Sequence, residues 1–269
     1  MFTPPPPRFA KYNVDPLFDV QTYPLIGHLA MTSVTIGVLG ILLRRRGFVK
    51  YRVGRINYWL RMSELDVARF NRRTTRSDSY EIPDADSNPQ HIETLSSLHS
   101  VNLEHSDSRD SDASFINPTP EPDSGAPIVA IHGIGIGLLP YMAFIDRLVA
   151  TGRTVFLPEV DSVTGFRCWE TSASVKSPAT VASTLSAMIG SHGFFKAAFI
   201  GHSYGTSWVS FVCQYSPQIV DSVVFLDPIC FSLHLSHLTR MFVYQRSDPG
   251  GVSYVVRTDL MVHYTLQVR

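Results

Sequence analysis

The chain has 269 residues, of which 23 are lysine or arginine and 23 are aspartate or glutamate, so its formal net charge at pH 7 is zero. The charges are segregated, because a basic segment precedes an acidic one, and no nucleic-acid recognition motif accompanies the basic residues. Nucleic-acid binding is therefore not expected. The three cysteines, Cys168, Cys213 and Cys230, show no disulfide pattern.

Residues 1–24 form a short N-terminal tail, and residues 25–43 form an uncharged apolar segment. A helix of this length spans about 28 Å, close to the hydrocarbon thickness of a bilayer. The segment therefore predicts a single transmembrane helix, with the lipid membrane as its partner. A cleaved signal peptide fits less well, because the apolar region is long and follows prolines rather than a short basic stretch. A buried core helix is the other alternative.

The charges on either side of this segment predict its orientation. Three arginines follow directly at positions 44–46, and four more basic residues lie between positions 50 and 61. The positive-inside rule therefore predicts a single-pass protein whose C-terminal domain lies in the cytosol.

Two segments of contrasting composition separate the apolar segment from the rest of the chain. Residues 44–76 form a basic juxtamembrane segment, and the aromatic side chains interleaved over residues 48–76 predict a helix lying on an anionic lipid surface. Residues 77–125 are rich in serine, aspartate, glutamate and proline. Such a composition cannot bury enough apolar surface to fold, so a disordered linker is expected there.

A folded domain is expected over residues 126–269. Apolar runs typical of buried strands alternate with helical patterns; the strand-like runs are 128–131, 154–158, 197–200 and 222–226, and the helical ones are 139–150, 180–189 and 206–214. This alternation predicts an α/β domain with a mainly parallel sheet covered by helices.

The first strand leads into a glycine-rich turn, His132-Gly133-Ile134-Gly135-Ile136-Gly137. A dinucleotide-binding loop would need glycine at the next position, which is Leu138, so that interpretation fails. Two readings remain. The backbone of Gly133 and Ile134 could approach a substrate carbonyl as an oxyanion loop, or the glycines could form only a structural turn.

The third strand leads into Gly201-His202-Ser203-Tyr204-Gly205, which is followed by a helical pattern. Gly-x-Ser-x-Gly at a strand-to-helix junction is typical of a nucleophile elbow. The serine of such a turn adopts a positive φ, and the residues two before and two after it crowd each other, so both are glycine. The N–H of Tyr204, at the start of the helix, is then available to an oxyanion.

With both motifs in order, the chain resembles the α/β-hydrolase superfamily from residue 126 onward. It looks most like membrane-associated fungal-type hydrolases that carry a Leu-Asp-Pro-(Ile/Val)-Cys element, here residues 226–230. The resemblance implies Ser203 as nucleophile and Gly133, Ile134 and Tyr204 as the oxyanion hole. Asp227 is either the acid or part of an Asp-Pro turn that ends the strand. No metal and no cofactor is implied.

The resemblance also implies a catalytic histidine on a strand beyond the last one found. The stretch 231–269 looks more like cap helices, so the family's last strands are expected to be missing from this chain. His132 is expected to structure its loop, and His202 to point into the sheet packing. His234 and His237 lie one helical turn apart, but no further ligand at suitable spacing supports zinc.

These features predict a membrane-anchored serine hydrolase acting on an ester-like, hydrophobic substrate, such as a lipid. The alternative is a non-catalytic membrane protein that keeps a hydrolase scaffold. In either case the last predicted strand is expected to form an unpaired, apolar sheet edge.

Overall fold

The computed structural model describes residues 24–77, 125–165, 175–232, 234–235 and five single positions near the C-terminus (254, 258, 259, 262 and 265). The chain divides into two compact units, Met1–Phe70 with Ser124–Arg269, and Asn71–Asp123. The sheet and the helices that cover it belong to the first unit. The expected tail, linker and cap helices lie almost entirely outside the described residues, and so does the predicted loss of the last strands.

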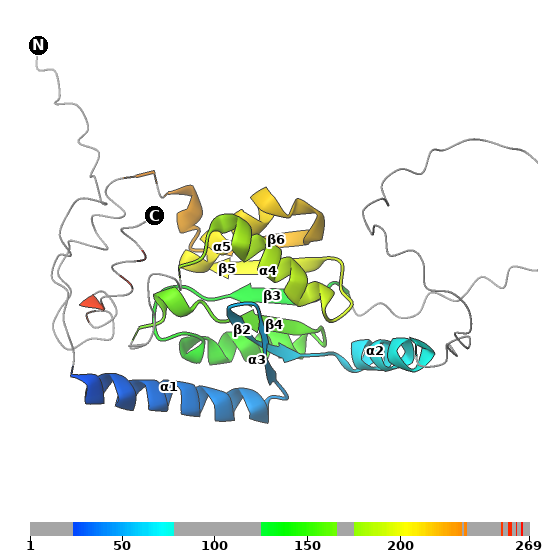
Figure 1. The fold of residues 1–269 in the computed structure, drawn as a ribbon, viewed down its shortest axis with the longest axis horizontal. Helices are drawn as coiled ribbons and strands as arrows, with labels where there is room; N and C mark the ends of the chain where they lie inside the picture. The colour runs from blue at the N-terminus through cyan, green and yellow to red at the C-terminus, as the bar shows by residue number, and fades with distance from the viewer. Residues whose placement is uncertain are drawn as a thin grey trace, which may run out of the picture. The chain divides into compact units, whose positions relative to one another are not determined.

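A mixed, mostly parallel sheet forms the centre of the first unit (Figure 1). Within the described residues it has six strands in the order β1-β2-β4-β3-β5-β6. Their bounds are β1 Val49–Val53, β2 Ile56–Arg61, β3 Ile128–Ile131, β4 Val155–Pro158, β5 Ala197–His202 and β6 Val220–Leu226. The four strands from β4 to β6 are parallel, and β1 and β2 are antiparallel to their neighbours. The predicted α/β class is confirmed.

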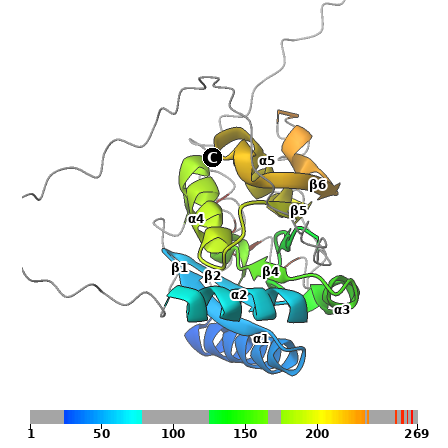
Figure 2. The same ribbon diagram turned by 90° about the vertical axis from the view of Figure 1, so that its right-hand side faces the viewer.

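Helices cover both faces of this sheet (Figure 2). Helices α4 (Pro178–Gly190) and α5 (Tyr204–Tyr215) pack on one face, while α1 (Leu25–Arg45) and α3 (Met142–Ala150) pack on the other. Helix α2 (Glu64–Ser77) follows β2. The described residues also include four short 3₁₀ turns, at Leu139–Tyr141, Asp161–Val163, Pro217–Ile219 and Ile229–Phe231. Successive strand residues point to opposite faces, so Val129 joins the core under α4 and α5, and Ala130 joins the core under α1 and α3.

The helix predicted over residues 48–76 is wrong for its first half. Residues 49–61 form a hairpin of β1 and β2 that turns at Gly54, whose φ is +53°. Ile56, Tyr58 and Leu60 enter one core, and Trp59 enters the other. Because β2 pairs with β4, the sheet takes strands from both sides of residues 77–125, so the expected start of the domain at residue 126 is too late.

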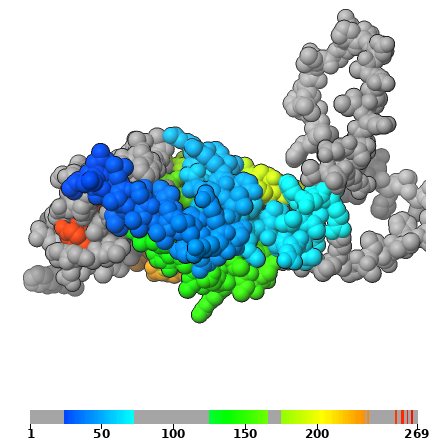
Figure 3. Space-filling view, turned by 90° about the horizontal axis from the view of Figure 1, so that it is seen from below, coloured from blue at the N-terminus to red at the C-terminus, as the bar shows by residue number. Residues whose placement is uncertain are grey.

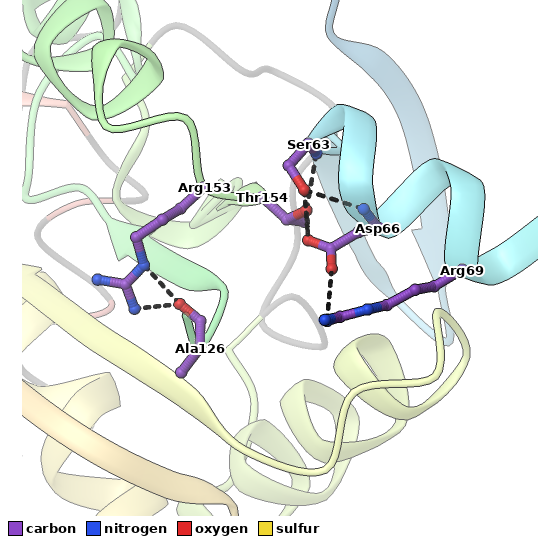
Figure 4. Close-up of polar contacts among 6 residues, drawn as sticks. All are labelled: Ser63, Asp66, Arg69, Ala126, Arg153 and Thr154. Atoms are coloured by element: carbon purple, nitrogen blue, oxygen red, sulfur yellow. Dashed lines mark hydrogen bonds and ion pairs between the residues drawn. The ribbon is translucent and has the colours of Figure 1, made fainter. Parts of the chain in front are cut away.

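A buried polar network ties α2 to the amino end of β4 (Figure 4). The Oδ2 atom of Asp66 accepts hydrogen bonds from the hydroxyls of Ser63, at 2.7 Å, and Thr154, at 2.6 Å. The hydroxyl of Ser63 accepts the backbone N–H of Asp66 at 3.1 Å, which caps the helix. Arg153 donates to the backbone carbonyl of Ala126 beside it.

Helix α1 starts at the predicted position and extends two residues further, to Arg45. It is the one helix in the described part that is long and apolar enough to cross a membrane, although a signal sequence near an N-terminus has the same properties. Its C-terminal half packs on the domain, where Leu39 and Leu43 are buried beside Trp59. Arg46 then forms an ion pair with Asp146 of α3 at 2.5 Å, which lowers the pKa of that carboxyl group.

The predicted apolar edge is observed at β6, which has β5 as its only partner among the described residues. Val224 and Leu226 on this strand are exposed.

Candidate active site

Ser203 lies at the junction of β5 and α5 and has a strained backbone. Its φ of 50° and ψ of −118° fall outside the regions that a residue with a side chain normally adopts. The turn therefore has the positive φ that the sequence predicted. Tyr204 is the first residue of α5, so the positive end of the helix dipole lies beside Ser203.

Two glycines make this turn possible. A Cβ on Gly201 would lie 2.8 Å from the carbonyl oxygen of Gly205. A Cβ on Gly205 would overlap the carbonyl oxygen of Ile131 and lie 2.8 Å from that of His132. Both neighbours are backbone and cannot rotate away. The crowding expected between positions 201 and 205 is therefore present, and Gly205 additionally allows α5 to press against the end of β3.

The glycine-rich turn after β3 lies against the elbow. A Cβ on Gly133 would be 2.9 Å from the Cβ of Ser203, so only glycine fits there. The N–H of Gly133 donates to the hydroxyl of Tyr141 at 3.0 Å, whereas the N–H of Ile134 has no partner within the described part of the chain. Of the two predicted loop donors, Ile134 is thus the one whose N–H is open to a ligand.

His132 is buried and uses both of its ring nitrogens. Its Nε2 atom accepts the N–H of Val160 at 2.9 Å, and its Nδ1 atom donates to the carbonyl of Gly133 at 2.8 Å. These two bonds require the neutral ring with the proton on Nδ1. His132 therefore holds the glycine-rich turn to the end of β4 and has no lone pair left to act as a base, as the sequence led us to expect.

Tyr141 connects the glycine-rich turn with the elbow. Its oxygen accepts the N–H of Gly133 and lies 2.8 Å from Nδ1 of His202. Burial raises the pKa of Tyr141, so the phenol keeps its proton. The His202 side chain is directed at Tyr141. Sequence reasoning missed Tyr141, since a tyrosine in an amphipathic helical pattern carries no signal of such a role.

The loop after β4 supports the glycine-rich turn from its other side. The N–H of Gly135 donates to the carbonyl of Val163 at 3.1 Å, and the N–H of Gly165 donates to the carbonyl of Gly135 at 2.9 Å. These bonds give the turn a fixed backbone path before any substrate binds.

Asp227 is the second residue with a side chain and a positive φ, at 49°. It directly follows Leu226, whose carbonyl accepts the N–H of Ser203 at 2.9 Å. The chain then returns to α5, where the N–H of Cys230 donates to the hydroxyl of Thr206 at 3.2 Å. Asp227 is exposed at the carboxyl end of the strand next to that of Ser203. This position suits either the acid or the strand-ending turn.

Within the described residues, no histidine forms a hydrogen bond with Ser203. His132 is bonded through both ring nitrogens, His202 is bonded through Nδ1, and His234 is exposed. His237 and His263 lie outside the described residues. A cluster of three or more metal-ligating side chains is likewise not found among the residues that the structure describes.

An apolar cavity of about 230 Å³ lies beside the elbow, between α3 and the sheet. Its polar residues are the three already bonded to one another or to the backbone, namely His132, Tyr141 and His202. The rest of its lining is aliphatic or aromatic: Ala130, Ile131, Leu138, Phe144, Ile145, Leu157, Ile200 and Leu226.

Comparisons with known proteins find similar folds at low identity. No protein-family model matches the sequence, and no curated protein matches it either. Among solved structures, a carboxylesterase of the thaumarchaeon Nitrososphaera gargenis aligns at 18% identity over 54% of this chain and 64% of its own, with a TM-score of 0.39. Carboxylesterase CesB of Bacillus subtilis aligns at 14% identity over 51% and 54% of the two chains, with a TM-score of 0.33.

Epoxide hydrolase A of Mycobacterium thermoresistibile aligns at 25% identity over 38% of this chain and 32% of its own, with a TM-score of 0.33. This chain thus spans less than two thirds of the length of each of these proteins. Because the TM-scores are 0.39 or lower, function is inferred from the geometry around Ser203.

Proposed function

We propose that this protein is a membrane-associated serine hydrolase of the α/β-hydrolase class that acts on an ester through Ser203. The observation that carries the proposal is the strained Ser203 at the start of α5, with the backbone of Gly133 pressed against it. Backbone strain at a residue that a glycine-lined pocket over-determines is typical of catalytic sites. An ordinary strand-to-helix connection requires neither the positive φ nor the close approach.

The proposed reaction follows from the groups around Ser203 at the carboxyl edge of the sheet. The Oγ atom of Ser203 attacks the ester carbonyl and gives its proton to a histidine base. The oxyanion that forms accepts hydrogen bonds from the N–H groups of Ile134 and Tyr204. Collapse breaks the bond to the alcohol, which leaves with the proton from the base, and water then hydrolyses the acyl-enzyme by the same steps. Asp227 would orient the base.

The proposed substrate has a hydrophobic acyl group. The cavity beside the elbow holds roughly seven or eight groups of the size of water or methylene, at about 30 Å³ each, and eight of its eleven lining residues are aliphatic or aromatic hydrocarbons. Helix α1 would attach the protein to a membrane, with the catalytic domain on the cytosolic side as the arginines after it suggest. Its C-terminal half is buried on the domain at Leu39 and Leu43, so a crossing over the full length of α1 is not part of the proposal.

A non-catalytic scaffold is the second candidate, favoured by one observation: no described histidine is directed at Ser203. The two candidates differ in the reactivity of that hydroxyl. Loss of the base from a serine triad lowers turnover by a factor on the order of 10⁶, while an intact oxyanion hole retains about 10³ over water.

Fluorophosphonate labelling of the full chain in detergent tests the proposal, with the modified residue mapped by mass spectrometry. We expect slow labelling of the 269-residue chain at Ser203, and none in Ser203→Ala. Ser207→Ala is the matched control, because this buried serine lies one turn along the same helix, and it should label like the parent protein. Labelling that persists in Ser203→Ala, or none in the parent protein, would reject the proposed nucleophile.

A further inference from the structure

Gly133 has no side chain to restrict its backbone, although the loop that it belongs to lies against the nucleophile. Position 133 has to be glycine, because a Cβ there would lie 2.9 Å from the Cβ of Ser203. Glycine also has the widest choice of backbone conformations. The N–H of Ile134 belongs to the next peptide unit, so its direction changes with rotation about the backbone bonds of Gly133. The loop therefore needs contacts from outside to hold that N–H in place.

Two side chains supply such contacts, one on each side of the Cα of Gly133. The N–H of Gly133 donates to the hydroxyl oxygen of Tyr141 at 3.0 Å. The carbonyl of Gly133 accepts a hydrogen bond from Nδ1 of His132 at 2.8 Å. A trans peptide unit is planar, so the N–H of Ile134 points opposite to the carbonyl of Gly133. With both peptide planes held, the direction of the Ile134 N–H is fixed.

Tyr141 differs from His132 because it also binds the strand that carries the nucleophile. Its oxygen lies 2.8 Å from Nδ1 of His202, the residue directly before Ser203. The rings of Tyr141 and His202 meet edge to face, with centroids 5.5 Å apart. His132 instead binds the loop after β4, at the N–H of Val160. Tyr141 therefore links the glycine-rich turn directly to the strand of Ser203, and oxyanion stabilisation depends on the geometry between these two segments.

Tyr141 lies on a well-packed part of the domain. It ends the 3₁₀ turn Leu139–Tyr141, which contains a proline, and it is the N-cap residue of α3. Helix α3 packs on the sheet beside α1, and Figure 3 shows α3, in green, next to α1, in blue. The ion pair of Arg46 with Asp146 joins the two helices. The hydroxyl group of Tyr141 is thus held in place before any substrate binds.

We propose that Tyr141 is a positioning residue of the oxyanion hole, with its hydroxyl group bound to the N–H of Gly133 and to His202. It engages the N–H of Gly133 and leaves that of Ile134 as the donor from the loop to the oxyanion. The effect on catalysis rests on the proposed function, whereas the placement of the Gly133 N–H does not. One oxyanion-hole donor contributes a factor of about 10²–10³ to the rate, so a displaced donor has a measurable effect.

Amide hydrogen exchange tests the placement without any chemistry at Ser203. The chain contains two His-Gly pairs, 132–133 and 192–193, so carbonyl-¹³C histidine with ¹⁵N glycine gives two amide signals in a carbonyl-filtered NMR spectrum. His192→Gln removes one signal and thereby assigns both. In Tyr141→Phe we expect the Gly133 N–H to exchange faster by about tenfold or more. Gly193 is the internal reference, because its N–H donates to the carbonyl of Gly190. An unchanged exchange rate at Gly133 would overturn the proposal.

Fluorophosphonate labelling of Ser203 in detergent tests the effect on catalysis. We expect Tyr141→Phe to label more slowly than the parent protein by about tenfold or more. Tyr58→Phe is the matched control, because it removes a hydroxyl that lies 2.9 Å from Nε2 of His192 on β2, three strands away from β5. This control should label like the parent protein. Equal slowing in both variants would overturn the proposal. Faster labelling of Tyr141→Phe would also overturn it, since the Gly133 N–H would then be the better donor.

Substitutions of His202 give a second test if Tyr141→Phe disturbs the packing of the cavity. His202→Leu removes the partner of the hydroxyl group and should reproduce both effects of Tyr141→Phe. His202→Asn keeps a polar atom near the place of Nδ1, so it should protect the Gly133 N–H and label faster than His202→Leu by about threefold or more. Equal behaviour of these two variants would contradict the proposed role.

The two measurements separate this proposal from the proposed function. If the parent protein does not label at Ser203, the proposed function is rejected, and exchange at Gly133 still decides where the hydroxyl group of Tyr141 acts. If the parent protein labels and Tyr141→Phe exposes the Gly133 N–H without slower labelling, only the positioning role is rejected.

Discussion

The carboxyl and amino edges of the parallel strands differ in backbone conformation and in the hydrogen bonding of their polar side chains. At the carboxyl edge lie Ser203 and Asp227, the two residues other than glycine that have a positive φ among those described. They end adjacent strands, β5 and β6. At the amino edge, Ser63, Asp66 and Thr154 form short, reciprocal hydrogen bonds in ordinary conformations (Figure 4).

This difference separates the part of the fold that supplies stability from the part that holds strain. A strained backbone residue costs about 1–3 kcal/mol and persists only where the surrounding packing leaves it no alternative. Around Ser203 that packing is backbone against backbone at Gly133, Gly201 and Gly205. At the amino edge, no described residue other than glycine has a positive φ, and the buried carboxylate of Asp66 is bonded to two hydroxyls. Substitutions at the carboxyl edge should therefore destabilise the protein through steric overlap, and substitutions at the amino edge through lost hydrogen bonds.

The largest effect is expected from Gly205→Ala. Its Cβ would overlap the carbonyl oxygen of Ile131, and neither β3 nor α5 can move without breaking the sheet or the helix. We expect a loss of stability above about 3 kcal/mol, seen as failure to express in folded form or as a large fall in the unfolding midpoint in detergent.

Gly190→Ala is the control for this substitution. Gly190 ends α4 with open space around its Cα, so alanine should be neutral or slightly stabilising there. If Gly205→Ala instead proves as stable as the parent protein, the close packing of α5 on the end of β3 is not a property of this fold.

The carboxyl edge was also the part that could be predicted best from sequence. Glycine at positions 201 and 205 indicates that no Cβ fits on either side of Ser203. The five residues 201–205 are enough to show this, and the positive φ of Ser203 follows from the tight turn. The inner parallel strands β3, β4 and β5 were recognisable as short apolar runs buried on both sides. Asp227 could be placed at the end of its strand, whereas its positive φ could not, because an Asp-Pro pair is compatible with several turns.

The hairpin of β1 and β2 could not be predicted from the same kind of pattern. Strand β1 lies at the edge of the sheet with Lys50 and Arg52 in solvent, so its composition resembles that of a basic surface helix. In strand β2, Trp59 and Tyr58 point to opposite faces of the sheet. Both side chains are buried because β2 pairs with β4, which lies almost 100 residues later in the sequence. The contact of Tyr141 with His202 was missed for the same reason, since the two residues are 61 positions apart.

The second prediction concerns the amino edge, where Asp66→Ala removes the acceptor of two buried hydroxyls. Ser63 and Thr154 would keep their donors but lose the partner, whereas the cap of α2 would remain, because its donor is the backbone N–H of residue 66. We expect the free energy of unfolding to fall by about 2–3 kcal/mol, measured by urea unfolding in detergent, with fluorophosphonate labelling of Ser203 unchanged.

Asp146→Ala is the control for this second change. It removes an aspartate whose carboxylate binds Arg46 at the surface, so its effect on stability should be small or absent. An equal loss of stability in both variants would mean that the buried network at Asp66 is no more important than an exposed ion pair.

The smallest expected effect is a pH dependence from His192, which follows α4 at the amino edge. Its Nε2 atom lies 2.9 Å from the hydroxyl of Tyr58, and its ring contacts Tyr51 and Phe156. Burial lowers the pKa of His192, whereas the unfolded chain has a histidine pKa of about 6.5. The unfolded state therefore binds a proton first as the pH falls, and stability declines below about pH 6.5 until the folded pKa is reached.

Unfolding curves of the parent protein and His192→Gln between pH 5 and 7.5 measure this decline. The parent protein should lose its advantage over the variant as the pH falls, and a difference that stays constant over this range would show that His192 does not titrate differently in the folded state.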